Sequence, residues 1–161
     1  MKKILFSLFA LLTFSFLQAQ IASDDELKYI KDALKSEKKD LVKEYMGLTD
    51  AQSSKFWPLY DEYQNQRGGL GRERLQIIRD YASQYAQLTD DQAKSLIKRV
   101  IKNDKANTKL QQKYFKKMSK AVSPLKAAQY LQLESYFQTL VRYEVQDAIP
   151  FIGEIERKKG N

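Results

Sequence analysis

The side chains with the clearest capacity to bind something are lysines that recur every three or four positions between residues 94 and 120. The set is Lys94, Lys98, Lys102, Lys105, Lys109, Lys113, Lys116 and Lys120. On a helix that turns about 100° per residue, all of them fall within about 100° of arc. The stretch from Lys94 to Lys126 contains only one acid, Asp104.

A face of one sign is unusual, because like charges four residues apart on a helix repel each other. One reading is a solvated face. The other is a surface that binds an acidic partner, either another molecule or the charged helix predicted at the start of this chain. The residues predicted to bind are the six central lysines, joined by two tyrosines of the preceding helix: Lys98, Lys102, Lys105, Lys109, Lys113, Lys116, Tyr60 and Tyr63.

The tyrosines enter because the chain is rich in aromatic residues, with ten Tyr and eight Phe. Core packing of thin helices is one explanation for them. The alternative is a binding face that uses the apolar body and polar tip of tyrosine.

Catalysis finds little support. The chain has no histidine and no cysteine, so Ser–His and Cys–His nucleophile pairs and His or Cys metal ligands are excluded. Neighbouring carboxylates such as Asp61 and Glu62 look like capping or solvated charges. We therefore predict a protein that is not an enzyme and has no cofactor, metal site or catalytic residue.

Two copies of one short pattern, forty residues apart, predict where the helices that carry these residues begin. Leu48, Thr49 and Gln52 form the first copy, and Leu88, Thr89 and Gln92 form the second. In each, the threonine can cap the first turn while the glutamine reaches back to the threonine N–H, which is a capping box.

The pattern of caps and apolar spacing predicts an all-α chain of four helices. They are expected at 24–46 (capped by Ser23 and ended by Gly47), 50–85, 90–120 and 124–148. Pro58 should kink the second helix. The glycines at 68, 69 and 71 are unfavourable inside a helix, so two alternatives stay open for the second helix. It is either one long bent helix, which we favour, or two helices separated near Gly69. Helices two and three should form a long antiparallel hairpin, elongated and bent.

The ends of the chain predict export. Residues 1–19 have a positive start, an apolar stretch and a small residue at the end, as in a cleaved signal peptide. We expect a helical domain at 20–150, a basic tail at 151–161, and a soluble periplasmic protein. With no cysteine it cannot be a lipoprotein. Export argues against nucleic acid as the partner of the basic face, despite a formal net charge of +8.

An export signal, four helices and a helix start at Leu48–Gln52 resemble the Spy/CpxP-like periplasmic family with its LTxxQ motif. The segment Phe56–Tyr60 looks more like an uncharacterised branch of exported helical proteins. The resemblance implies a bent, cradle-shaped antiparallel homodimer. Its basic concave face would hold unfolded clients without ATP, or dock on a sensor protein in an envelope-stress response.

Three functions stay open from the sequence. The first is an exported ATP-independent chaperone or stress-response accessory protein that binds unfolded or acidic polypeptides. The second is an adaptor or regulator of one membrane sensor protein. The third is a protein that binds anionic lipid.

Overall fold

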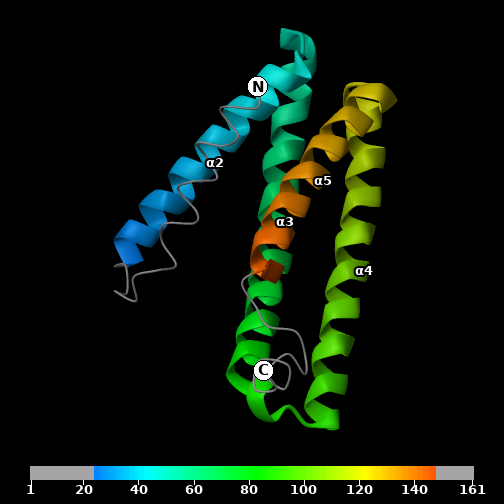
Figure 1. The fold of residues 1–161 in the computed structure, drawn as a ribbon. Coiled ribbons are helices and arrows are strands. Elements are labelled where there is room, and N and C mark those ends of the chain that lie inside the picture. The colour runs from blue at the N-terminus through cyan, green and yellow to red at the C-terminus, as the bar shows by residue number, and fades with distance from the viewer. Residues whose placement is uncertain (1–23, 148–161) are drawn as a thin grey trace. The chain divides into compact units, whose positions relative to one another are not determined.

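The computed structural model describes residues 24–147 of this chain (Figure 1). The described residues form four α-helices and one short 3₁₀ turn, and no strand is present among them. The elements are α2 (Asp24–Met46), α3 (Asp50–Gln84), η2 (Tyr85–Gln87), α4 (Asp90–Ala121) and α5 (Pro124–Asp147). The all-α prediction is confirmed. The predicted signal peptide, the Ser23 cap and the basic tail lie outside the described residues.

Both predicted capping boxes are present. The Thr49 N–H donates to Gln52 Oε1 at 3.1 Å, and the Gln52 N–H donates to Thr49 Oγ1 at 3.3 Å. The same two bonds join Thr89 and Gln92 at 2.9 and 3.4 Å. Each box satisfies N–H groups that the first helical turn leaves without a partner, so the repeat sets where α3 and α4 begin.

The other two predicted boundaries are also confirmed. Gly47 follows α2 with φ of 49°, and its N–H donates to the Lys43 carbonyl at 3.3 Å. This is the left-handed C-terminal cap that glycine adopts without steric cost. At the start of α5, Ser123 Oγ accepts the Lys126 N–H at 3.1 Å, and Pro124 is the first helical residue.

Helix α3 runs without interruption through Pro58 and the glycine segment, so the alternative of a split is wrong. A methyl group built on Gly71 meets nothing within 4 Å. One built on Gly68 or Gly69 meets only the Arg72 guanidinium, at 3.7 and 3.8 Å. No backbone approaches these glycines closely, and none of them needs a positive φ.

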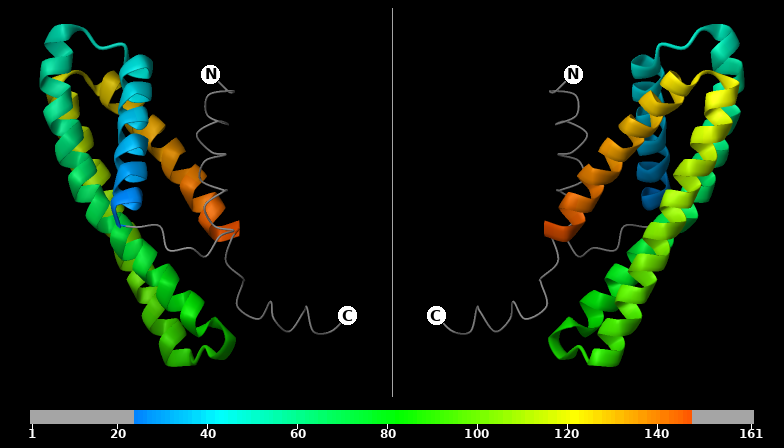
Figure 2. Two further views of the ribbon diagram at one scale, coloured as in Figure 1. Left: turned by 90° about the vertical axis from the view of Figure 1, so that its left-hand side faces the viewer. Right: turned by 90° about the vertical axis from the view of Figure 1, so that its right-hand side faces the viewer.

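The chain divides into two compact units, residues 1–41 and residues 42–161. In the first unit, the described part is the N-terminal portion of α2. In the second, α3 packs along α4 and α4 packs along α5 (Figures 1 and 2).

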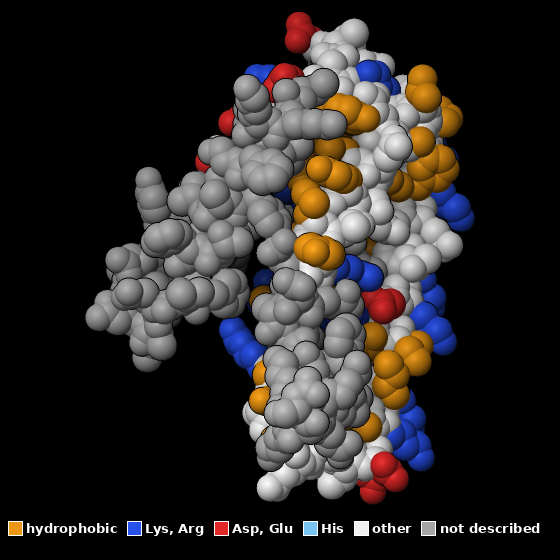
Figure 3. Space-filling view, viewed as in Figure 1, with side chains coloured by type: hydrophobic (Ala, Val, Ile, Leu, Met, Phe, Trp, Pro, Cys, Tyr) orange, Lys and Arg blue, Asp and Glu red, His pale blue; other side chains and the backbone are white. Residues whose placement is uncertain are grey.

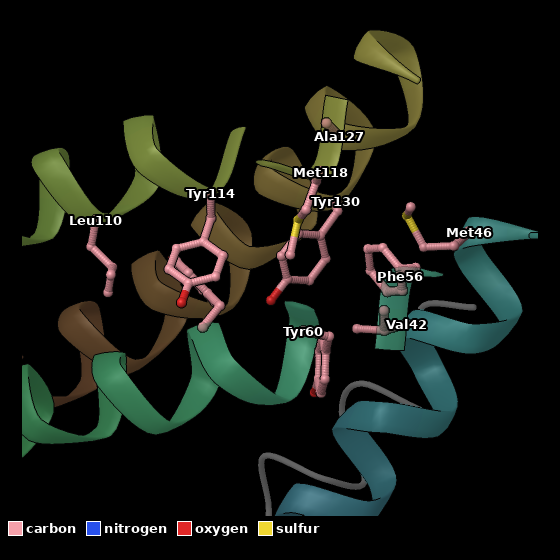
Figure 4. Packing of buried hydrophobic residues seen from close by; sticks show 10 residues of the cluster. Val42, Met46, Phe56, Tyr60, Leu110, Tyr114, Met118, Ala127 and Tyr130 are labelled. Carbon is pink, nitrogen blue, oxygen red and sulfur yellow. The ribbon is translucent and has the colours of Figure 1, made fainter. Parts of the chain in front are cut away.

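The core of the second unit is aromatic and lies where α3, α4, α5 and the last turn of α2 meet (Figure 4). The Phe56 and Tyr130 rings cross at 84°, and the Tyr63 and Tyr114 rings cross at 69°, both edge-to-face. The cluster consists of Val42, Met46, Phe56, Tyr60, Tyr63, Leu110, Tyr114, Met118, Ala127 and Tyr130.

Candidate functional site: a basic face on helix α4

The lysines of α4 lie on one exposed side of the helix, which we call the lysine face. All eight lysines named above are exposed. In the space-filling view, blue side chains follow the edge of the molecule that α4 forms (Figure 3). On the other side of α4, Leu110, Tyr114 and Met118 are buried in the core. The side of the helix that carries the lysines is therefore turned away from the core.

The one acid within this stretch does not neutralise the lysines. Asp104 binds two arginines from other helices, Arg142 at 2.9 Å and Arg74 at 3.4 Å. Among residues 35–143, the part of the chain whose side chains the structure describes, no ion pair joins any of the eight lysines to a carboxylate. The lysine face consequently presents its positive charge to solvent without a carboxylate paired to it among the described side chains.

Two cations of α4 that do form ion pairs, Lys117 and Arg99, pair with carboxylates of α3. Lys117 binds Glu62 at 3.0 Å, and Arg99 binds Asp80. The hydrogen bond from Lys117 lowers the pKa of the Glu62 carboxyl, and the bond from Arg99 lowers that of Asp80. The cations of α4 are thus of two kinds. Lys117 and Arg99 form ion pairs with carboxylates of α3, and the lysines of the lysine face do not.

Lys113 lies at the border between the lysine face and the contact with α3. Its Nζ is 3.5 Å from Gln66 Oε1 and 5.5 Å from the centre of the Tyr114 ring. Both contacts are compatible with an exposed ammonium group.

Exposed apolar side chains accompany the lysines along α4. Ile97 is 53% exposed, Ile101 47% and Phe115 38%. By helical spacing they follow one flank of the lysine face, within one turn of several lysines. The surface is therefore basic with apolar spots, and is not uniformly charged.

The structure does not bring the two predicted tyrosines to this surface. Tyr60 and Tyr63 are 4% and 0% exposed and pack against Tyr130 in the core. Burial raises the pKa of Tyr63 to about 12, with a further contribution from the charge of Glu134. Their rings fill the space between thin helices, so they are core residues and not binding residues.

Sequence reasoning missed a buried charged residue, Glu134 of α5, which is 1% exposed. Arg67 Nε lies 3.0 Å from its carboxylate, and Gln64 and Gln138 donate to it at 2.8 and 3.4 Å. The sequence position of Glu134 could have indicated its burial, because it lies four residues after Tyr130 and therefore on the same, inward side of α5. A glutamate on such a side needs a cation and hydrogen-bond donors from another helix.

A second polar residue in the interior, Asn103 of α4, also has a structural role. It is 4% exposed, and its Nδ2 donates to the Leu70 carbonyl at 2.9 Å. The bond ties α4 to the glycine segment of α3. It explains an asparagine on the apolar side of the helix.

Comparisons with known proteins found no match, whether with family models, curated proteins or solved structures. No helix of the described chain is long and apolar enough to cross a membrane. Among the side chains that the structure describes, those of residues 35–143, no group of three or more His, Cys, Asp or Glu is placed to hold a metal ion.

Proposed function

We propose that this protein is an exported, ATP-independent chaperone or envelope-stress accessory protein that binds unfolded or acidic polypeptides. The observation that carries the proposal is the lysine face: eight exposed lysines on one helix, with the nearby Asp104 already bound by two arginines. Self-repulsion along such a face is relieved when an acidic chain lies on it. Export to the periplasm rests on the apolar segment within residues 1–19.

The surface suits partners without a fixed shape. Long lysine side chains adapt their positions to irregular carboxylates, and their attraction acts over about 8–10 Å at physiological salt. Ile97 and Ile101 offer apolar contacts next to these charges. Such a combination holds an extended polypeptide by many weak contacts, which need no nucleotide to form or release.

The proposal includes the elongated form expected from the sequence: α3 and α4 as a long, bent antiparallel hairpin, assembled as a homodimer. Two contacts between these helices support the hairpin. Arg99 near the start of α4 reaches Asp80 near the end of α3, while Lys117 near the end of α4 reaches Glu62 near the start of α3. That order is the one expected of antiparallel neighbours.

The direct test is suppression of client aggregation, followed by light scattering, with stoichiometric amounts of the mature protein. The wild type is expected to suppress aggregation of acidic unfolded clients. A charge-reversed variant of the face should lose that effect; it replaces four lysines by glutamate: Lys102, Lys105, Lys109 and Lys113.

A matched control keeps the same change in net charge but alters exposed cations elsewhere. It carries glutamate at Lys43, Lys55, Arg72 and Arg79, all of which are exposed. The control should suppress aggregation like the wild type. Equal failure of wild type, face variant and control with several clients would refute the proposal. One acidic protein that co-purifies with the wild type and is lost from the face variant would instead indicate an adaptor or sensor-regulator.

A further inference from the structure

Helices α3 and α4 continue beyond the end of α5. A short turn at residues 122–123 joins α4 to α5, and the two helices pack along each other, so they run in opposite directions. Arg142 of α5 binds Asp104 of α4 at 2.9 Å, and α5 is described for only five residues more, to Asp147. At about 1.5 Å per residue in both helices, that end is level with Arg99 of α4. Figures 1 and 2 show that α3 and α4 extend well past it.

Beyond that end, α4 presents apolar residues on the side that faces α5. Asp104 marks this side, because it binds Arg142. Apolar residues seven, four and three positions before Asp104 share the same side of the helix. They are Ile97, Val100 and Ile101. Ile97 is 53% exposed and Ile101 47%, so both keep about half of their surface in solvent.

Helix α3 adds two apolar residues beside them. Arg74 also binds Asp104, at 3.4 Å, and therefore marks the corresponding side of α3. Ile78 follows Arg74 by one turn, and Leu75, which is 49% exposed, precedes Ile78 by one turn. None of the five apolar residues belongs to the core cluster or to the half-buried residues packed against it. We call this set the distal surface: Leu75, Ile78, Ile97, Val100 and Ile101.

Cations border the distal surface and restrict what can cover it. On α4, Lys94 and Lys98 each lie one turn before an isoleucine of this surface. On α3, Arg79 lies one turn after Leu75. All three cations are exposed. A second copy of this chain, with its formal charge of +8, would bring more positive charge to this border. The surface instead fits a short apolar segment that also carries carboxylates.

The segment that follows α5 has this chemistry. Residues 148–156, which lie outside the described residues, read Ala-Ile-Pro-Phe-Ile-Gly-Glu-Ile-Glu. Four of them are large and apolar, and the only charged ones are Glu154 and Glu156. An apolar stretch that carries two negative charges and no positive one matches an apolar surface bordered by lysine and arginine.

The same segment begins close to the distal surface and is long enough to cover it. Pro150 has no N–H and disfavours continuation of α5, so the chain can turn there. Eight extended residues reach about 26 Å, whereas α4 runs only about 14 Å from Arg99 to its first residue, Asp90. Because the segment is joined to α5, its effective concentration at this surface is in the millimolar range, which favours it over a free polypeptide.

We propose that residues 148–156 bind the distal surface of their own chain, with their apolar side chains against it and their glutamates next to Lys94 and Lys98. This docking goes beyond the proposed function and does not depend on it. One consequence does rest on the proposed function. The docked segment covers Ile97 and Ile101, the apolar side chains offered to a client, so the segment and the client compete for them.

The first test uses disulfide formation within one chain, because the protein has no native cysteine. Glu154→Cys is combined with Lys94→Cys or, as the control, with Lys105→Cys. Both lysines are exposed on the lysine face, five and six residues from the level of Arg99, so an undocked segment would reach them about equally. Docking predicts that the Lys94 pair closes at least about tenfold faster than the Lys105 pair, followed by mass spectrometry in dilute solution.

The second test leaves residues 148–156 unchanged and follows chymotrypsin cleavage after Phe151 in the native protein. Leu75→Asp with Ile97→Asp should speed this cleavage at least about tenfold, because cleavage tracks the fraction of the segment that is undocked. The control, Leu125→Asp with Tyr136→Asp, changes exposed apolar residues of α5 and should be cleaved like the wild type. Thermal unfolding of both variants verifies that the fold is kept.

The outcomes separate this inference from the proposed function. Equal disulfide rates at the two lysines, or equal cleavage of the wild type and the distal-surface variant, would overturn the docking. A disulfide that forms only between chains would also overturn it and assign the surface to a second copy. None of these measurements includes a client, so their failure leaves the proposed function standing. Failure of the wild type to suppress aggregation would leave the docking standing and remove only the competition with a client.

Discussion

Replacing the three glycines of α3 by alanine should stabilise the protein. Gly68, Gly69 and Gly71 lie inside a continuous helix, where glycine costs about 1 kcal/mol relative to alanine. The Gly71 methyl would enter open space, and the other two would meet the flexible Arg72 side chain at ordinary contact distances. The triple variant should therefore gain about 2–3 kcal/mol, or roughly 5–10 °C in Tm for a domain of this size.

The assay is equilibrium urea unfolding followed by circular dichroism, supported by thermal melts. Gly47→Ala serves as the control, because its φ of 49° is strained for any residue with a Cβ, and it should lose about 1 kcal/mol. A triple variant that is no more stable than the wild type would contradict the helical role of these glycines. It would mean that α3 is broken at the glycines or that the segment must flex in the native state.

Three further predictions concern caps, the buried charge and pH. Thr49→Ala and Thr89→Ala should each lower the free energy of unfolding, measured with urea, by about 1 kcal/mol, and the two effects should add. A double variant as stable as the wild type would contradict the capping role. Glu134→Ala should lower the free energy of unfolding by about 3–5 kcal/mol, because it leaves the Arg67 guanidinium without its anion. In the same assay, the double variant Glu134→Leu with Arg67→Met should recover much of that lost stability. The pKa of Tyr63 is raised to about 12, so its stabilising contribution is complete below pH about 10, the unfolded value, and is lost as pH rises through 12. Ultraviolet absorbance should show tyrosinate from Tyr63 forming only with alkaline unfolding, and early ionisation would contradict its burial.

Local signals were sufficient for the helix boundaries. A capping box requires only Thr49 and Gln52 three residues apart, and the glycine at 47 ends α2 by its own backbone freedom. The glycine segment was ambiguous, because propensity opposes a helix there by a few kcal/mol at most. Packing of α3 along α4, with Asn103 bound to the Leu70 carbonyl, favours the continuous helix.

The exposure of the lysines also followed from the sequence, since helical spacing determines which residues share a side. The placement of Tyr60 and Tyr63 did not. A tyrosine at helical spacing suits a core and a binding face equally well, and only the position of Tyr130 on a distant helix decides between them.

The burial of Glu134 could not be predicted from helical spacing either. Its environment depends on Gln64 and Arg67, which are about seventy residues earlier in the chain. A single glutamate among apolar residues reads as solvated unless the pairing of α3 with α5 is known. Helical periodicity in the sequence cannot predict such contacts between distant segments of the chain.

The most direct test of the lysine face is its affinity for an unfolded acidic chain as a function of salt. Fluorescence anisotropy with labelled polyglutamate would compare the wild type with the variant that has glutamate at Lys102, Lys105, Lys109 and Lys113. We predict that the wild type binds polyglutamate with an affinity that falls steeply as the salt concentration rises, and that the variant does not bind it. Labelled polylysine should not bind to this face of either protein. Equal affinity of wild type and variant for polyglutamate would contradict the account.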